Sequence, residues 1–529
     1  MVANTNSYTL QAEADRIFKS MVSDERLNLP QEAKQFASRV KFVGSETEPF
    51  YPVPFKCAES QAAVLGYIGT LALAISKARF NLDQDVSVDV AQALLAGLGA
   101  LFMRCEDKWL SSSDKMVSAV KRWDHGKTRE LYRQLGTNIY KTKDGRWYSL
   151  HGNMDPTPLL TMLRLPQHDE KNRSWAEILD MYMEIVAQLD SEDLDNESNN
   201  VYRLPGTICY EKEEFQALPQ GIALKDEPWY NLTREPYNQA PVAWPEPSDP
   251  SDQRPLSGIK VLELARAIAA PTVGRVCAAL GATVIRVSSA TNTELPITLI
   301  DGCVGKISVD INLKTFEGRK KLMELIKDAD VFVDGYRPSV LEHLGFGRDA
   351  VFGLVARRDR GIVYCQENCY GWKGPWVTRP GWAQIADAVT GVGLSVGRFN
   401  GFDEAHIFPG PNADYFYGEY DQDQIEKLKK RNPELVGHMR HYDEIVSHGR
   451  NRHCVRGFIA DRPFEDALPK HYYQTLSGVG WGLPDIDVVR FPLSLSKTST
   501  DFPVGAFPPG YHVPKWAAEE NITFEKIAP

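Results

Sequence analysis

Asp414 is a side chain whose setting could support covalent chemistry. It ends a Pro-Asn-Ala-Asp turn at 411–414, where a carboxylate can be exposed at a cleft. A carboxylate in such a place can attack an activated carbonyl and so split one difficult group transfer into easier steps. The competing interpretation is a helix N-cap, a position that aspartate often occupies. The local sequence alone favours the cap, although the amides of a helix start would also favour an ionised Asp414.

A second stretch that could bind a ligand is the turn RAIAAP at 266–271. Its small side chains allow a ligand to approach the backbone, and the turn opens a predicted helix. A helix N-terminus presents unpaired N–H groups and the positive end of its dipole, which together favour phosphate. The turn lacks the Gly-x-Gly-x-x-Gly pattern of dinucleotide-binding sites, so a generic NAD-binding enzyme is the weakest alternative.

Alternating strands and helices are predicted for the part of the chain that carries both features. Short apolar runs indicate strands at 259–264, 282–287, 330–334 and 361–365. Small-residue and amphipathic patterns predict helices at 267–280 and 315–327. Strand and helix repeating in units of about thirty residues are typical of a parallel, doubly wound sheet. We therefore expect an α/β fold with a Rossmann-like sheet.

The N-terminal half has a different pattern, which is typical of a smaller α+β unit. We expect a long helix of small residues at 59–78, a strand at 85–90 and a second apolar helix through Leu98. Asp144-Gly145 predicts a type I′ hairpin between two strands. The polar stretch 191–200 is interpreted as a loop. Six prolines within 236–255 indicate an extended linker.

Composition and charge bound the function. A chain of 529 residues is too long for one ordinary core, and 43% hydrophobic with 25% charged residues is typical of a folded protein. The net charge of -10 gives no support to nucleic-acid binding. The eight cysteines are scattered, and the pair Cys365 and Cys369 has no further ligands nearby, so no metal site is expected. We find no secretory signal and no run of about 20 apolar residues, and therefore expect a cytoplasmic protein without a membrane span.

Four ordered blocks of the second half resemble the class III CoA-transferase family, the superfamily of carnitine CoA-transferase, formyl-CoA transferase and alpha-methylacyl-CoA racemase. They are PLSGIKVLELARAIAAPTVGRVCAALGATVIRV at 255–287, GKISVDINLKTFEGRKKLMELIKDADVFVDGYRPSVLEHLGFG at 305–347, IVYCQENCYGWKGPWVTRPGWAQIADAVTGVG at 362–393 and GPNADYFYG at 410–418. The last is similar to the block that holds the family's catalytic aspartate. The resemblance implies the family's fold, a Rossmann-like doubly wound parallel sheet with a smaller α+β domain.

The N-terminal half resembles the later portion of the same family's sequence. Segment 59–98 is similar to the part that normally follows the catalytic aspartate, and YKTKDGRWYSLHGN at 140–153 is similar to the small-domain entry hairpin. The halves thus stand in an unusual order. We expect residues 59–98 to lie beside Asp414 and to supply the layer that the chain lacks after Gly418. The predicted regions are an N-terminal region at 1–235, the linker at 236–255, a CoA-binding domain at 256–418 and a C-terminal segment at 419–529 that returns to the core.

The resemblance implies an acyl-CoA:carboxylate CoA-transferase in which Asp414 is the catalytic carboxylate. It would use acyl-CoA and a carboxylic acid, pass through an aspartyl-CoA thioester, and need no metal. By resemblance, Ala267 and Ile268 would line CoA. Further contacts are expected from the segments Cys303-Val304-Gly305-Lys306 and Gly335-Tyr336-Arg337, with Tyr336 stacking on adenine and Lys306 or Arg337 meeting phosphate. Because members of the family form interlinked homodimers, a homodimer is a further expectation.

Departures from the family pattern keep two alternatives open. His343 and Asn368 stand where the family often has basic residues, and Ser288 stands where an acidic residue usually ends the second strand. A non-catalytic CoA-binding homologue would explain these changes. The other alternative is a 2-methylacyl-CoA racemase of the same fold, which needs acid/base groups on both sides of the reacting carbon. Its histidine should stand where this chain has Trp382. The glycine-rich stretch 391–401 is interpreted as a mobile cover over the site.

Overall fold

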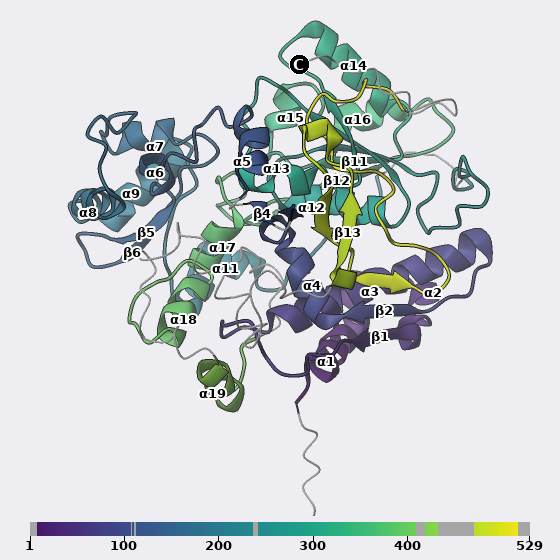
Figure 1. The fold of residues 1–529 in the computed structure, drawn as a ribbon, viewed down its shortest axis with the longest axis horizontal. Helices are drawn as coiled ribbons and strands as arrows, with labels where there is room; N and C mark the ends of the chain where they lie inside the picture. Colours follow the sequence, from purple (N-terminus) through teal and green to yellow (C-terminus); the bar gives the residue numbers. More distant parts are fainter. Residues whose placement is uncertain are drawn as a thin grey trace, which may run out of the picture.

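The computed structural model describes residues 8–106, 108–110, 113–235, 242–408, 418–431 and 470–516. A five-stranded parallel sheet lies beside a layer of N-terminal helices, and a separate small unit projects from one side of the molecule (Figure 1). Asp414 lies outside the described residues. The structure therefore bears on that residue only through the chain on either side of it.

The parallel sheet reverses its strand order in the middle. Its strands, in spatial order, are β10 (Ile307–Asp310), β9 (Thr283–Ser288), β8 (Lys260–Leu264), β11 (Val331–Asp334) and β12 (Val363–Gln366). All neighbouring pairs are parallel. The chain builds outward from β8 to β10 and then crosses back to place β11 on the other side of β8. At such a switch point the loops diverge and leave a crevice at the carboxyl ends of the strands, where ligands bind in this class of sheet. The Rossmann-like sheet expected from the sequence is confirmed.

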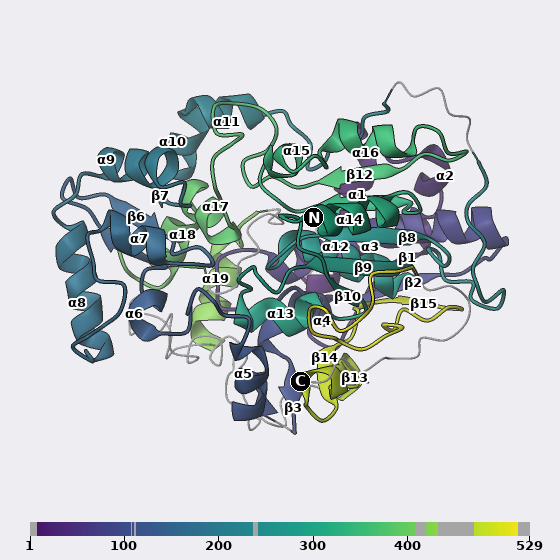
Figure 2. The ribbon, with the colours of Figure 1, turned by 90° about the horizontal axis from the view of Figure 1, so that it is seen from above.

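Helices cover both faces of this sheet, because successive side chains of a strand point to opposite faces. Leu262 and Phe332 pack with three helices on one face, whereas Val261 and Val333 pack with a single helix on the other. The three are α14 (Phe316–Ile326), α15 (Val340–His343) and α16 (Arg348–Val355), and the single helix is α12 (Ala269–Ala279). The sheet is therefore doubly wound, as Figure 2 shows from above.

The N-terminal layer is organised around the long helix α3 (Cys57–Phe80), which packs against α1 (Leu10–Ser23) and α4 (Val90–Gly97). These helices and the strand at 86–89 confirm the order of elements expected for this segment. Strands β1 (Val40–Val43) and β2 (Val86–Asp89) run parallel beside α3.

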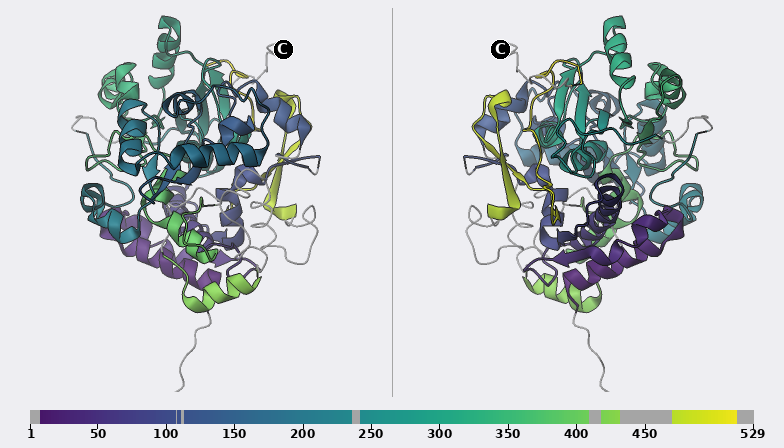
Figure 3. Two further views of the ribbon diagram at one scale, coloured as in Figure 1. Left: turned by 90° about the vertical axis from the view of Figure 1, so that its left-hand side faces the viewer. Right: turned by 90° about the vertical axis from the view of Figure 1, so that its right-hand side faces the viewer.

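Strands from the C-terminal part complete the N-terminal sheets (Figure 3). β15 (Leu493–Leu495) pairs antiparallel with β2. β14 (Ile486–Val489) pairs with β13 (Tyr473–Leu476) and with β3 (Arg104–Cys105), which in turn pairs with β4 (Lys108–Trp109). The first and last parts of the described chain therefore share one structural layer.

Helix α3 is long and apolar enough to cross a membrane by length and composition alone. It has 24 residues, and its most apolar window has a mean hydropathy of 1.3. The expectation that no stretch reaches this length is therefore wrong. In this structure 67% of that window is buried inside the protein, and core helices pass the same test. The small side chains of α3 let neighbouring elements approach closely, since a Cβ on Gly69 would lie 2.8 Å from Val86.

The small unit has its own hydrophobic core. Its antiparallel sheet consists of β5 (Asn138–Lys141), β6 (Trp147–Leu150) and β7 (Thr207–Ile208). Helices α6 (Leu131–Gln134), α7 (Thr157–Met162) and α8 (Trp175–Val186) contribute to that core. The rings of Tyr140 and Tyr182 stack at its centre, with centroids 5.7 Å apart.

The hairpin turn between β5 and β6 is present, but its type differs from the prediction. The N–H of Gly145 donates to the carbonyl of Thr142 at 3.0 Å, and the N–H of Thr142 donates to that of Arg146 at 2.8 Å. Gly145 has a φ of 82°, whereas Asp144 does not have a positive φ. A type I′ turn needs positive φ at both central residues, so this is a type I turn followed by a left-handed glycine.

The stretch at 191–200 is helical, so the predicted loop is wrong. Helix α9 (Ser191–Asn196) continues into the π-helical turn η5 (Glu197–Val201). The buried amide of Asn199 donates to the carbonyls of Asp195 at 2.9 Å and Gly206 at 3.0 Å. Polar side chains favour a loop when they are solvated, but here they satisfy backbone groups inside the fold.

The glycine-rich stretch at 391–401 is the packed helix α18 (Val392–Phe399) rather than a mobile cover. A Cβ on Gly397 would lie only 1.7 Å from the carbonyl oxygen of Glu404. The glycine therefore allows two backbones to touch. Helix α17 (Ala383–Val389) precedes α18, and α19 (Gln422–Arg431) follows the segment that carries Asp414.

Candidate active site

The crevice at the switch point lies between the ends of β8 and β11. Gly335 donates its N–H to the carbonyl of Leu264 at 3.0 Å, and a Cβ on it would lie 2.5 Å from that of Ala270. The backbone after β11 thus packs directly on the first turn of α12. Ala267 has a φ of 66°, a left-handed conformation that is uncommon for alanine, and Ile268 beside it is exposed. The structure therefore brings Ala267, Ile268 and Gly335 together at this edge.

Three arginines gather around the same edge. The guanidinium of Arg266 lies 5.6 Å from the centre of the Tyr336 ring. Arg337 donates to the backbone carbonyl of Arg203 at 3.3 Å, so a residue of the small unit reaches the switch point. Burial, together with the charges of Arg203 and Arg266, lowers the pKa of Arg337. The guanidinium of Arg203 donates to the carbonyl of Thr378 at 2.9 Å, and that of Arg266 donates to the carbonyl of Thr293 at 3.0 Å. The positive charges at this edge form an electrostatic site that suits phosphate oxygens.

Tyr336 is half-buried at the mouth of the crevice, where its backbone N–H donates to the carboxylate of Asp334 at 3.0 Å. Burial raises the pKa of its hydroxyl group. The aromatic face is already covered in part by Arg266. Stacking of adenine on Tyr336 stays a prediction. The adenine would have to share the tyrosine ring with Arg266.

The segment at 303–306 is not exposed in the crevice. The side chains of Cys303, Val304 and Lys306 are fully shielded from solvent, and Gly305 packs against Phe502. The ammonium group of Lys306 is bound by other groups of the protein core. Any contact between this segment and CoA would therefore require its backbone or a rearrangement, and the predicted contact between Lys306 and phosphate finds no support in this geometry.

The chain that leads toward Asp414 is held by the segment before α3. Phe408 is the last described residue on this side, and its ring lies 6.2 Å from that of Tyr51 and 6.3 Å from that of Phe55. Just before it, Ile407 packs with Ile139 of the β5–β6 hairpin in one apolar cluster. The entrance to the segment is therefore fixed by both the N-terminal layer and the small unit.

The chain that leaves the Asp414 segment is held by the same stretch. The carbonyl of Gly418 accepts a hydrogen bond from the N–H of Lys56 at 3.2 Å. The N–H of Tyr420 donates to the carbonyl of Pro54 at 2.8 Å. Both ends of the segment thus lie at the N-terminus of α3. The expectation that residues 59–98 lie beside Asp414 stays a prediction, because Asp414 lies outside the described residues.

Trp382 occupies the position where a racemase would need a histidine. Its indole Nε1 donates to the side chain of Asn153 at 3.2 Å, and its ring stacks on that of His151 with the centroids 6.1 Å apart. The Nδ1 atom of His151 accepts from the N–H of Asn153 at 2.9 Å, and burial lowers the pKa of His151 to about 4. The histidine is therefore neutral near pH 7 and is poorly suited to accept a proton there.

The three residues that depart from the family pattern are engaged locally. The Nδ1 atom of His343 contacts the carbonyl of Ser339. Asn368 donates to the carbonyls of Gly371 and Val377 at 2.7 and 2.8 Å and so closes the loop after β12. Ser288 is buried, and its hydroxyl donates to a backbone carbonyl of β10 at 3.2 Å. Each of these side chains stabilises its own loop or strand end in this structure.

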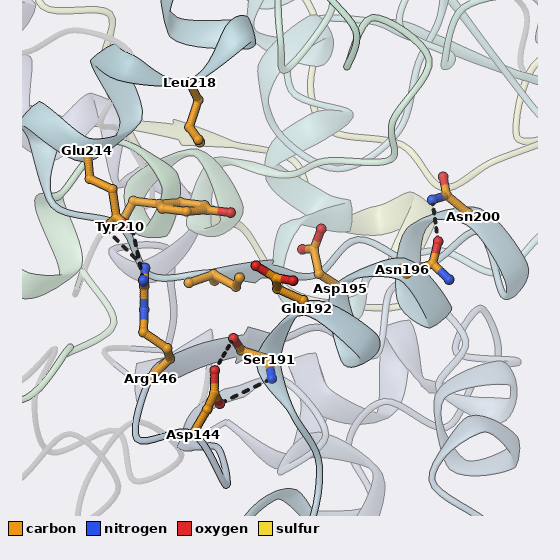
Figure 4. A pocket seen from close by; sticks show the side chains of 11 residues that line it. Asp144, Arg146, Ser191, Glu192, Asp195, Asn196, Asn200, Tyr210, Glu214 and Leu218 are labelled. Carbon is orange, nitrogen blue, oxygen red and sulfur yellow. Dashed lines mark hydrogen bonds and ion pairs between the residues drawn. The ribbon is translucent and has the colours of Figure 1, made fainter.

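A pocket of about 440 Å³ lies in the small unit between the β5–β6 hairpin, α9 and the start of α10 (Lys212–Ala217), as Figure 4 shows. Four carboxylates line it, those of Asp144, Glu192, Asp195 and Glu214. Arg146 also lines it but is paired with Glu214 at 2.9 Å. Carboxylates repel the phosphates of CoA, so we do not assign the acyl-CoA site to this pocket.

No group of three or more His, Cys, Asp or Glu side chains that could hold a metal ion occurs among the residues that the structure describes. Burial raises the pKa of Cys365, which disfavours the thiolate that a metal prefers. Cys369 is exposed and has its sulfur 3.7 Å from the carbonyl of Trp382.

The sequence did not identify two residues, Arg203 at the switch point and Glu59 at the start of α3. Arg203 reaches the crevice from a turn with a φ of 54°, and no local pattern links it to a partner more than a hundred positions away. Glu59 lies on the first turn of α3, and its side chain is fully buried. A charged residue inside a run of small apolar residues was the signal that could have identified Glu59.

Comparison with known proteins shows which family the sequence matches. The sequence model of CoA-transferase family III matches residues 256–406. Acetyl-coenzyme A transferase nodX of Hypoxylon pulicicidum is 37% identical over 422 residues, which cover 78% of this chain and 71% of that protein. An acyl-CoA transferase of Gibberella moniliformis is 32% identical over 411 residues, which cover 76% of this chain and 70% of that protein. Because the chain after residue 255 is shorter than either match, both matches extend into the N-terminal half.

Among solved structures, a CAIB/BAIF family protein from Brucella suis is 25% identical, with 42% of this chain and 64% of that chain covered. The TM-score is 0.27, a superposition too loose to support any argument about the site. The assignment therefore depends on the sequence matches and on the strand order.

Proposed function

Because this chain belongs to CoA-transferase family III, we propose that it moves CoA from an acyl-CoA to a carboxylic acid through a thioester on Asp414. Membership of this family makes the protein a transferase that acts on acyl-CoA. The aspartyl intermediate and the identity of the nucleophile are the proposal.

The proposed reaction needs no net proton transfer and no oxidant. An oxygen of the Asp414 carboxylate attacks the thioester carbon of the donor, and CoA leaves as the thiolate. The thiolate then attacks the side-chain carbonyl of Asp414 in the mixed anhydride, which releases the donor acid and leaves aspartyl-CoA. The acceptor carboxylate attacks this thioester, and the thiolate finally attacks the acceptor carbonyl. The products are the new acyl-CoA and the free carboxylate of Asp414.

The observation that carries the proposal is the arginine group at the switch point. Arg203, Arg266 and Arg337 converge where ligands bind in sheets of this order, and phosphates are the anionic part of CoA. The chain that leaves the Asp414 segment is held at the start of α3, and the place of Asp414 beside that helix end, which would favour its ionised form, is part of the proposal.

Replacement of Asp414 tests the nucleophile directly. The variant D414N should lose CoA exchange between a panel of acyl-CoA donors and free acids. Hydroxylamine or borohydride added with acyl-CoA should modify Asp414 in the native protein, as read by peptide mass spectrometry. The matched control is D421N, since Asp421 is exposed and caps α19 through the N–H of Gln424 at 3.0 Å.

Three outcomes would contradict the proposal. Full CoA exchange by D414N would remove Asp414 as the nucleophile. Deuterium uptake next to the thioester of a chiral 2-methylacyl-CoA in D₂O, without exchange of CoA, would favour the racemase alternative instead. Binding of CoA without either reaction would favour the non-catalytic homologue.

A homodimer and a cytoplasmic location complete the proposal. The homodimer is expected from the family resemblance, and the location is an expectation from the sequence alone. Sedimentation of the purified protein and imaging of the tagged protein in cells test them separately.

A further inference from the structure

Three side chains around the turn that follows β6 form a cluster that the proposed reaction leaves unused. His151 and Asn153 belong to the turn itself, and Trp382 precedes the first residue of α17. The indole Nε1 of Trp382 donates to the side-chain oxygen of Asn153 at 3.2 Å, and the indole ring stacks on the ring of His151. All three side chains are half-buried, so the cluster is packed and still partly open to solvent.

The neighbouring residue Met154 connects this turn to the crevice at the switch point. The hydroxyl of Thr293 donates to the carbonyl of Met154 at 3.5 Å, and the carbonyl of Thr293 accepts from Arg266 at 3.0 Å. Thr293 follows β9, whereas Trp382 follows β12, and β8 and β11 lie between these two parallel strands. Helix α17 lies between the small unit and the parallel sheet in both Figure 1 and Figure 2. The turn at 151–154 therefore bridges loops from both sides of the switch point, at the carboxyl edge where ligands bind in such sheets.

The hydrogen bonds of the turn fix which nitrogen of His151 carries a hydrogen. A backbone N–H can only donate, and that of Asn153 donates to Nδ1 of His151 at 2.9 Å. Nδ1 is therefore the unprotonated nitrogen, and the hydrogen of the ring is on Nε2. Burial lowers the pKa of His151 to about 4, which keeps the ring neutral near pH 7.

The side-chain amide of Asn153 is oriented by the same kind of constraint. The indole Nε1–H of Trp382 can only donate, so the atom that it meets is the amide oxygen, and the NH₂ group is turned away from the indole. Among the residues that the structure describes, neither Nε2 of His151 nor Nδ2 of Asn153 has a hydrogen-bond acceptor. One turn thus offers two neutral N–H donors at the carboxyl edge of the sheet.

We propose that the Nε2–H of His151 and the Nδ2–H of Asn153 bind the carbonyl oxygen of the acyl thioester, and that Trp382 is the positioning residue for both. When a carboxylate attacks the thioester carbon, the electron pair of the C=O bond moves onto this oxygen, and the two N–H groups donate to the oxyanion. When the intermediate collapses, the C=O bond forms again, the C–S bond breaks and its electron pair leaves with the sulfur. The inference rests on the proposed CoA transfer but not on which carboxylate attacks.

Unreactive analogues test the inference without turnover. One is the ketone analogue of acetyl-CoA, in which a methylene group replaces the thioester sulfur, and the other is S-ethyl-CoA, which lacks the carbonyl. We expect the native protein to bind the ketone about three- to tenfold more tightly, as one or two net hydrogen bonds imply. Both analogues carry the same phosphates, so general effects of charge cancel from the ratio of their Kd values. Isothermal titration calorimetry measures this ratio.

Two substitutions each remove one of the proposed donors. N153D keeps an oxygen for the indole of Trp382 and replaces the NH₂ group by a second oxygen. H151F keeps a planar ring against the indole and removes the Nε2–H. We expect each variant to lower kcat for CoA exchange by about a hundredfold to a thousandfold and to lose the preference for the ketone. In isotope-edited infrared spectra, the ¹³C=O band of the bound ketone should lie at a lower frequency in the native protein than in either variant.

The matched controls are N172D and H168F in the same small unit. Asn172 is exposed and has a φ of 47°, close to the 57° of Asn153, and the side chain of His168 is 56% exposed. Both controls should leave kcat within about twofold of the native value and the ratio of Kd values unchanged, since neither residue lies at the turn.

The inference is overturned if the native protein binds the ketone no more tightly than S-ethyl-CoA. It is also overturned if the folded variants N153D and H151F keep the native ratio and the native band frequency, and one folded variant is sufficient for this comparison. A preference for the ketone in a protein that exchanges no CoA would reject the proposed function and leave the carbonyl site standing. Exchange of CoA through Asp414 without that preference would reject the carbonyl site alone.

Discussion

Lys306 and Glu263 form an ion pair at 2.8 Å inside the parallel sheet, and both side chains are fully shielded from solvent. The Lys306 ammonium also donates to the carbonyl of Pro271 at 2.7 Å, so all of its surroundings are protein groups. Burial lowers the pKa of Lys306 and raises that of Glu263, while each charge opposes the shift of the other. The residue expected to meet phosphate is thus a structural link between β8, α12 and β10.

Loss of one partner of this pair should be strongly destabilising. We expect K306M to lower the free energy of unfolding by about 3–5 kcal/mol, because it leaves Glu263 buried without a partner. Urea denaturation followed by circular dichroism measures the change. The double variant E263Q/K306M should recover part of the loss.

The control for that experiment is the exposed pair of Lys327 and Glu324, at 2.9 Å. K327M should change stability by less than about 1 kcal/mol, because solvent screens surface pairs. Equal losses in K306M and K327M would contradict the structural role of Lys306.

The arginine group at the switch point should contribute to binding of acyl-CoA rather than to turnover. We expect R337A and R203A each to raise KM for acyl-CoA by about tenfold, with a smaller change in kcat, since each would remove a proposed charged contact to phosphate. Steady-state kinetics at two salt concentrations measures the effect, which should shrink at high salt.

The matched control is R348A, because Arg348 is an exposed arginine of the same domain, 3.4 Å from Glu235. An increase in KM of the same size in R348A would show a general effect of charge. Unchanged KM in both R203A and R337A would remove the phosphate site from the switch point.

The buried Glu59 should make stability depend on pH in a defined window. Its pKa is about 7 in the folded protein and 4.5 ordinarily. Between these values the folded state keeps a proton that the unfolded state has lost, so this group's contribution to stability falls as the pH rises through the window. The difference in unfolding free energy between native protein and E59Q should therefore decrease from about pH 4.5 to about pH 7 and then level off.

Denaturation at a series of pH values measures this slope, with E317Q as the control because Glu317 is an exposed glutamate of α14. A constant difference between E59Q and native protein across the window would show that Glu59 titrates normally.

Two glycines with open space around them should respond in opposite ways to alanine. Gly145 has a φ of 82° and Gly353 lies in α16 without a positive φ, and neither would place a Cβ within 4 Å of another atom. We expect G145A to destabilise by about 1 kcal/mol through its left-handed backbone. G353A should stabilise by about 0.5–1 kcal/mol, because alanine favours a helix interior. Thermal unfolding of both variants measures the difference, and a change of equal sign would contradict the backbone explanation.

The sequence by itself determined the elements of the parallel sheet and the family. Apolar strands such as 330–334 have to be buried on both faces, and their alternation with helices leaves few possible topologies. The helix start after the turn at 266–271 was also predictable from its small residues, whereas ligand binding at that turn stays a prediction. Local rules of this kind were sufficient where the neighbours in sequence are also the neighbours in space.

Only the tertiary structure decided what the polar side chains do. Lys306 and Glu59 are charged residues that a sequence pattern places at a surface, yet packing between distant segments buries both and supplies their partners. The polar stretch at 191–200 became helical for the same reason, since Asn199 finds backbone carbonyls inside the fold. Such partners come from loops and helices far away in sequence. Their approach depends on the packing of the whole chain, which no local pattern records.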